Sequence, residues 1–293
     1  MITRFLDKAT VLAQDTNPEP WKVCTVTQVE EVKILTRMLP ILASTILMNT
    51  CLAQLQTFSV QQGNIMDLHL GHFLVPAASI PVIPLIFMSI LVPIYEFAFV
   101  PLARRLTGHP TGITHLQRVA VGLVLSAISM AVAAIIEVKR RNVFNHHLKQ
   151  LSVFWLSFQY GIFGIADMFT LIGLMEFFYS EAPIGMRSLA TSFAFLSIAL
   201  GYFLSTVIVK IVEAITGRMS SNGQGWLYGM DLNKNHLDRF YWLLAVLSCV
   251  NFGAYVMCAH WYKYRRVGHV GGVASNEGEV ESAVESESQQ RLI

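Results

Sequence analysis

Residues 115–138 read HLQRVAVGLVLSAISMAVAAIIEV, and the stretch between Arg118 and Glu137 contains no charged side chain. An α-helix rises about 1.5 Å per residue, so about 20 predominantly apolar residues cross the hydrocarbon core of a bilayer, which is about 30 Å thick. We therefore predict a transmembrane helix over residues 115–138.

Five more apolar segments of similar length occur, over residues 34–58, 77–100, 153–179, 188–212 and 240–264. Each is expected to be a helix, because a bare backbone finds no hydrogen-bond partner in lipid. The predicted fold class is an all-α integral membrane protein with six transmembrane helices. Pro81, Pro84 and Pro93 fall in the second segment, where we expect a kinked helix.

The bulk composition agrees with a protein that lies in a lipid bilayer. The 293 residues are 54% hydrophobic and only 14% charged, with a mean hydropathy of +0.50. Soluble domains usually carry about 25% charged residues. The net charge of +2, without a basic cluster interleaved with aromatic residues, does not indicate a nucleic-acid partner.

Sequence motifs of enzyme chemistry are missing. The chain has no HExxH, GxSxG or P-loop pattern. Its four cysteines form no CxxC or Cys/His spacing, and we interpret them as small buried side chains rather than metal ligands or disulfide partners. The sequence therefore indicates no enzyme, no cofactor and no metal site.

Composition divides the chain into three parts. Residues 1–31 are polar and are predicted to form a cytosolic loop segment, residues 32–265 hold the six-helix transmembrane domain, and residues 266–293 form an acidic tail that should be disordered. Of the 21 Lys and Arg residues, thirteen fall on the side of the membrane that holds both termini and eight on the other. This bias predicts that both termini are cytosolic.

Asp167 is the polar residue that stands out in the transmembrane segments. It lies near the middle of segment 153–179, and helical spacing places Tyr160 on the same face. A carboxyl group there can bind a proton reversibly, because burial favours its neutral form and a facing cation favours its charged form. The alternative is a structural ion pair.

The first segment contributes uncharged polar groups, Asn49, Thr50 and Gln54. They either line a solute pathway with Asp167 and Tyr160 or form hydrogen bonds to neighbouring helices. Three charged residues nearer the cytosolic side, Glu176, Arg37 and Arg187, are assigned a gating or structural role.

Several patterns resemble one family of membrane proteins. Residues 37–41 read RMLPI, residues 92–96 read VPIYE, and the most specific pattern is GLMEFFYSEAP over residues 173–183, followed by Met186-Arg187-Ser188. Together they are similar to the seventh, eighth, tenth and eleventh helices of plant nitrate/peptide transporters (the NPF branch of the proton-coupled oligopeptide transporters).

The resemblance implies a major facilitator fold of twelve helices, of which this chain matches helices 7–12. It implies a plasma-membrane, multi-pass protein whose partners are protons, a small solute and an N-terminal transporter half or a related membrane protein. Asp167 falls where the family usually has a glutamate that contacts substrate or pairs with a lysine. Leu52 falls where a nitrate-transporting member has a nitrate-binding histidine, so nitrate binding through a histidine at this position is not supported.

Two functions follow from these observations. The first is the C-terminal half of a proton-coupled symporter for a small anionic or organic solute such as nitrate, abscisic acid or peptide. The second is a truncated, non-transporting membrane protein that acts as a regulatory partner or is inactive.

Overall fold

The computed structural model describes residues 26–70, 73–107, 113–147, 150–182, 187–219, 225–227, 229, 232–233 and 235–262. The predicted acidic tail and most of the predicted N-terminal loop segment lie outside these residues. These residues contain seven α-helices, with bounds α1 (Val26–Gly63), α2 (Val82–Ile94), α3 (Val100–Thr107), α4 (His115–His147), α5 (Leu156–Glu181), α6 (Arg187–Met219) and α7 (Leu237–Trp261). A short antiparallel pair, β1 (His69–Leu70) and β2 (Phe73–Leu74), joins α1 to the second span.

The prediction of six transmembrane helices is confirmed. Six helical stretches are long and apolar enough to cross a membrane: Val29–Gly63, Ala77–Arg105, His115–His146, Val153–Glu181, Thr191–Met219 and Leu237–Trp261. Several exceed the predicted segments, because polar turns continue the helices beyond the apolar core of each span.

The start of α1 differs from the predicted boundary between residues 31 and 32. The helix begins at Val26, within the segment predicted to be a loop. Lys33 donates to Glu30 at 2.6 Å, one turn away on the same face. Such pairs at i,i+3 spacing stabilise a helical turn without an apolar environment, which is why hydrophobicity alone placed the start too late.

The second span is irregular, as its prolines predicted. A 3₁₀ turn (Ala77–Ser79) precedes α2, and a π-helical turn (Tyr95–Phe99) separates α2 from α3. Pro93 lies inside α2, and Pro101 lies one residue into α3. Since a proline has no N–H to donate to the preceding turn, the α-helical hydrogen-bond series is interrupted on both sides of the π turn.

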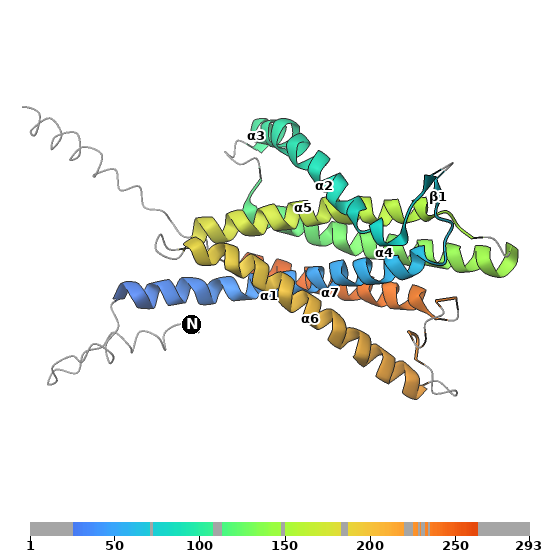
Figure 1. Ribbon diagram of the computed structural model, residues 1–293. Coiled ribbons are helices and arrows are strands. Elements are labelled where there is room, and N and C mark those ends of the chain that lie inside the picture. Colours follow the sequence, from blue (N-terminus) through green and yellow to red (C-terminus); the bar gives the residue numbers. More distant parts are fainter. Residues whose placement is uncertain are drawn as a thin grey trace, which may run out of the picture. The chain divides into compact units, whose positions relative to one another are not determined.

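Helix α7 packs antiparallel to α1 in the bundle. Within the unit Met1–Tyr262, α4 contacts α5, α7 and α1, α6 contacts α1 and α5, and α2 contacts α5 (Figure 1). Asn251 of α7 donates to the Ser44 carbonyl at 2.8 Å, and Tyr241 bonds Gln62 at the opposite end of α1. These pairs make α1 and α7 antiparallel.

Helices α1 and α6 run in the same direction and pack through a stripe of small residues on α6. Ser197, Gly201 and Ser205 recur at intervals of four residues, the spacing that lets two membrane helices approach closely. A Cβ atom added to Gly201 would lie 2.9 Å from the backbone carbonyl carbon of Asn49 and 3.0 Å from the Ile46 carbonyl oxygen. Only glycine fits this contact without displacing the α1 backbone.

We predict that Gly201→Val destabilises the folded protein by about 1–3 kcal/mol, because the added atoms overpack the α1–α6 contact. Thermal unfolding of the purified protein in detergent measures the effect. Gly253→Val is the matched control, since a Cβ at Gly253 of α7 meets no atom within 4 Å. Equal unfolding temperatures for the two variants would contradict the assigned role of Gly201.

Candidate functional site

Asp167 lies at the centre of the fourth span, fourteen residues from either end of Val153–Glu181. Its side chain is half-buried, and it forms no hydrogen bond or ion pair with any residue that the structure describes. Tyr202 of α6 lies within electrostatic reach of it. A carboxyl group at mid-membrane without a fixed partner is costly and is therefore a strong candidate for function.

Tyr160 is used differently from the prediction that it lines a pathway with Asp167. The side chain is fully buried, its hydroxyl donates to the Leu55 carbonyl at 3.0 Å, and it also hydrogen-bonds Ser59. Tyr160 thus ties α5 to α1, and its hydroxyl is occupied by these contacts.

The polar residues predicted on the first helix contact α6. Asn49 donates to Ser197 at 3.0 Å, Thr50 donates to the Gly201 carbonyl at 3.1 Å, and Gln54 donates to the Ser205 hydroxyl at 2.7 Å. Of the two interpretations, hydrogen bonding between helices describes these contacts. Gln54 also reaches a solvent-accessible space between the helices.

That space is a groove of about 400 Å³ between α1 and α6, which we call the α1–α6 groove. Its polar lining comes from Gln54, Thr57 and Gln61 of α1 and from Ser205, Thr206, Lys210 and Glu213 of α6. Leu227, Gly229 and Asn235 also contribute to the lining. The groove therefore offers a cation, a carboxylate and several amides and hydroxyls to a small solute.

Lys210 lies in this groove and was not among the site residues predicted from the sequence. It is exposed within the span Thr191–Met219 and pairs with no residue in the described part of the chain. A lysine facing hydrocarbon costs about 2.5–3.5 kcal/mol, so Lys210 is expected to face water or a polar partner. The signal was available, because Tyr202, Thr206 and Lys210 form a polar stripe at i,i+4 spacing.

Tyr202 belongs to the same polar stripe of α6 as the groove residues. Its hydroxyl donates to Gln56 of α1, while its next same-face neighbour, Thr206, lines the groove. We call Asp167, Tyr202 and the polar residues of the groove the polar track, although Asp167 and Tyr202 do not line the groove itself. Asn49, Thr50 and Tyr160 contribute to the helix contacts beside it.

Glu176 belongs to a separate cluster near the start of α4. It accepts a hydrogen bond from Arg118 and lies 3.0 Å from the His115 imidazole. The partners of Glu176 are therefore on α4. Arg37 is exposed on α1, and the Arg187 side chain lies outside the described residues.

Metal ligation finds no support in the described part of the chain. No group of three or more His, Cys, Asp or Glu side chains there can hold a metal ion. The prediction of buried cysteines holds for Cys51, which lies 3.4 Å from the Ser248 hydroxyl. It is wrong for Cys249, which is exposed, and for Cys258, which is half-buried, because Cys249 lies on the outer face of α7 and Cys258 lies in its last turn.

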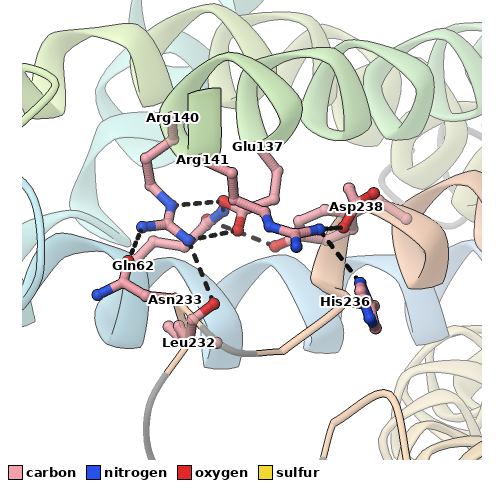
Figure 2. A network of polar contacts seen from close by, with 9 residues as sticks. Gln62, Glu137, Arg140, Arg141, Leu232, Asn233, His236 and Asp238 are labelled. Atoms are coloured by element: carbon pink, nitrogen blue, oxygen red, sulfur yellow. Dashed lines mark hydrogen bonds and ion pairs between the residues drawn. The ribbon is translucent and has the colours of Figure 1, made fainter. Parts of the chain in front are cut away.

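A buried ion pair joins two helices and the segment before α7 at the end of the molecule where α4 finishes. Arg140 donates to both carboxylate oxygens of Glu137, at 2.7 and 2.8 Å, and Gln62 donates to the same carboxylate at 2.7 Å (Figure 2). Arg140 also donates to Asn233 at 2.7 Å. Glu137 is fully buried, and its partners connect α1, α4 and the segment before α7.

Arg141 makes a second contact from α4 to the start of α7. It pairs with Asp238 and lies 3.3 Å from Nδ1 of His236 (Figure 2). Burial lowers the pKa of His236, and the charges of Arg239 and Arg141 act in the same direction. The imidazole is thereby kept neutral near pH 7 and can accept the hydrogen bond from Arg141.

The six helices of the described residues that are long and apolar enough to span a bilayer define a multi-pass membrane protein. Solved structures share the fold. A crystal structure of an auto inhibited POT family peptide transporter matches 83% of this chain and 43% of its own, with a TM-score of 0.58 and 22% identity. The POT family transporter PepTSo matches 82% of this chain and 45% of its own, with a TM-score of 0.60 and 19% identity.

The chain belongs to the POT family, whose model matches residues 2–227, and it is therefore a transporter-family protein rather than an enzyme. It is 51% identical to Protein NRT1/ PTR FAMILY 4.6 of Arabidopsis thaliana over 84% of this chain and 43% of that protein. It is 50% identical to Protein NRT1/ PTR FAMILY 4.3 of the same organism, over 88% and 44%. The chain thus spans less than half the length of these relatives.

We predict that Arg140→Met destabilises the protein by about 3–5 kcal/mol, because it leaves the Glu137 carboxylate buried without its guanidinium partner. The double variant Glu137→Leu with Arg140→Met should recover most of this loss, since no uncompensated charge remains. Thermal unfolding in detergent checks both, with the exposed Arg218→Met as control. A double variant as unstable as the single one would contradict the ion-pair explanation.

Proposed function

We propose that this chain is the C-terminal half of a proton-coupled symporter, corresponding to helices 7–12 of a major facilitator fold. The observation that carries the proposal is the half-buried carboxyl group of Asp167 at mid-span, which has no fixed partner among the described residues. Coupled uptake requires a proton site and a solute site, and the α1–α6 groove, on helices packed together with α5, supplies polar groups for the second.

The proposed chemistry assigns one role to each part of the polar track. Asp167 binds a proton on one side of the membrane and releases it on the other, and its neutral form lowers the cost of closing the site against lipid. Lys210 of the groove attracts the negative end of a solute, while the amides and hydroxyls supply directional hydrogen bonds. An N-terminal half supplies the facing wall, since substrate sites of this fold lie between repeats near the bilayer midplane.

Substrates of the proposed symporter are small anionic or organic solutes, and nitrate, abscisic acid and peptides are the ones to test first. Leu52 cannot donate a hydrogen bond to nitrate, so a nitrate site would depend on other residues, with Lys210 the cation available in the groove. Uptake of each solute is measured separately, with and without an acidic exterior, to identify which of them is carried and whether its uptake depends on protons.

The proposed location is the plasma membrane, with both termini in the cytosol. Three of the eight basic residues that oppose this orientation are engaged within the protein: Arg140 and Arg141 in ion pairs and Lys139 over the Trp155 ring at 3.4 Å. On the side of the termini, Lys33 and Arg118 are paired in the same way. The bias of the remaining residues supports cytosolic termini.

We predict that Asp167→Asn abolishes uptake driven by a pH gradient when the chain is joined to the N-terminal half of Protein NRT1/ PTR FAMILY 4.6 of Arabidopsis thaliana. Asparagine keeps the size of the side chain but cannot exchange a proton near neutral pH. Uptake into proteoliposomes with an acidic exterior measures the effect, and solute exchange without a gradient reports whether the site still binds.

Asp67→Asn is the matched control, because Asp67 lies outside the spans, where hydrogen bonds from His69 lower the pKa of its carboxyl group. Undiminished gradient-driven uptake by Asp167→Asn would refute the coupling role. Failure of every joined form to take up solute, with correct folding, would favour the non-transporting regulatory partner.

A further inference from the structure

A second pocket lies at the opposite end of the molecule from the Glu137–Arg140 pair. Its volume is about 310 Å³, and its lining includes Tyr95, Glu96, Arg104, Arg118 and Glu176. We call it the Tyr95 pocket. It is beside the end of the span Ala77–Arg105, where hydrocarbon gives way to headgroups.

Tyr95 is held rigidly in the wall of this pocket. It is 5% exposed, its ring stacks on Phe99 with centroids 5.2 Å apart, and Phe169 packs edge-on at 5.2 Å. The Arg118 guanidinium lies over the ring, 5.5 Å from its centroid. The π turn that begins at Tyr95 gives the side chain this position, and such turns occur frequently at functional sites.

The hydroxyl of Tyr95 is buried and forms no hydrogen bond with the residues that the structure describes. A buried hydroxyl that lacks a partner is costly, and native proteins seldom keep one without a ligand or a function. Because Tyr95 lines the pocket, an acceptor placed there would satisfy it.

Charges of both signs surround this hydroxyl. Arg104 and Arg118 contribute guanidinium groups, whereas Glu96 and Glu176 contribute carboxylates. Glu176 is already bound by Arg118 and His115, but Glu96 is exposed and forms no ion pair with a described residue. The pocket therefore suits a ligand that carries an anionic acceptor and a cationic donor a few atoms apart.

We infer that the Tyr95 pocket binds the headgroup of an ethanolamine phospholipid. The phosphate accepts a hydrogen bond from Tyr95 and lies beside the Arg104 guanidinium, which keeps the contact that it already makes within the protein, and the primary ammonium group donates to Glu96. The pocket lies at the end of the span, where hydrocarbon gives way to headgroups, and this position favours a lipid over a free zwitterion.

Thermal unfolding of the purified chain in detergent tests the inference, with phosphatidylethanolamine, phosphatidylcholine or phosphatidylglycerol of the same acyl length added. The ethanolamine lipid should give the largest rise in Tm, because the choline ammonium has no N–H to donate and the glycerol lipid has no ammonium. Equal rises for the three lipids would overturn the inference. Binding of glycerophosphoethanolamine as tight as that of the lipid would also overturn it, in favour of a free solute.

Tyr95→Phe should weaken ethanolamine-lipid binding about tenfold, as expected for the loss of one hydrogen bond to a charged group. The same variant should leave the lipid-free Tm unchanged or raise it, because it removes a hydroxyl with no partner. A merely structural role for the hydroxyl predicts a lower lipid-free Tm and unchanged lipid selectivity, which would overturn the inference. Arg104→Gln should also weaken binding, whereas its exposed neighbour Arg105→Gln, outside the lining, should not.

Discussion

Every polar group inside the hydrocarbon layer needs a partner within the protein, and α1 shows how this constraint organises the helices. Its span is the most buried of the six. Asn49, Thr50 and Gln54 bond α6, Ser59 bonds Tyr160 of α5, and Gln62 bonds Glu137 of α4. The helix is held less by apolar attraction, which lipid supplies equally well, than by these directional contacts.

The same constraint separates residues that hold the helices together from residues that are available for function. Glu137 is fully buried and surrounded by donors, so its charge is compensated in place. Asp167, Lys210 and the Tyr95 hydroxyl lie in spans of similar hydropathy without such partners in the described structure. Of these, Lys210 lines the α1–α6 groove and Tyr95 lines the Tyr95 pocket.

Sequence reasoning predicted the features that depend on one segment alone. It failed for features that depend on which other helix packs against that segment. Six helices follow from apolar length, and an irregular second span follows from its prolines. The face shared by Thr50 and Gln54 was also predictable, but not what lies opposite it. Gly201 explains why: its small size matters only because the Asn49 backbone approaches it, and no single-sequence pattern specifies that approach. The π turn at Tyr95 and the Glu137–Arg140 pair were missed for the same reason.

The distribution of satisfied polar groups also indicates how the six helices can move. The ion pair of Glu137 with Arg140 fixes α1 and α4 to the segment before α7, and Arg141 fixes α4 to α7 itself. The α1–α6 seam, with Gly201 at its closest contact, adds α6 to the same unit. Contacts of this kind resist bending within the unit, because breaking any one of them exposes a buried polar group. In the proposed symporter, a change of access around Asp167 would therefore be achieved more cheaply by rocking the whole unit against a facing half than by rearranging helices within it.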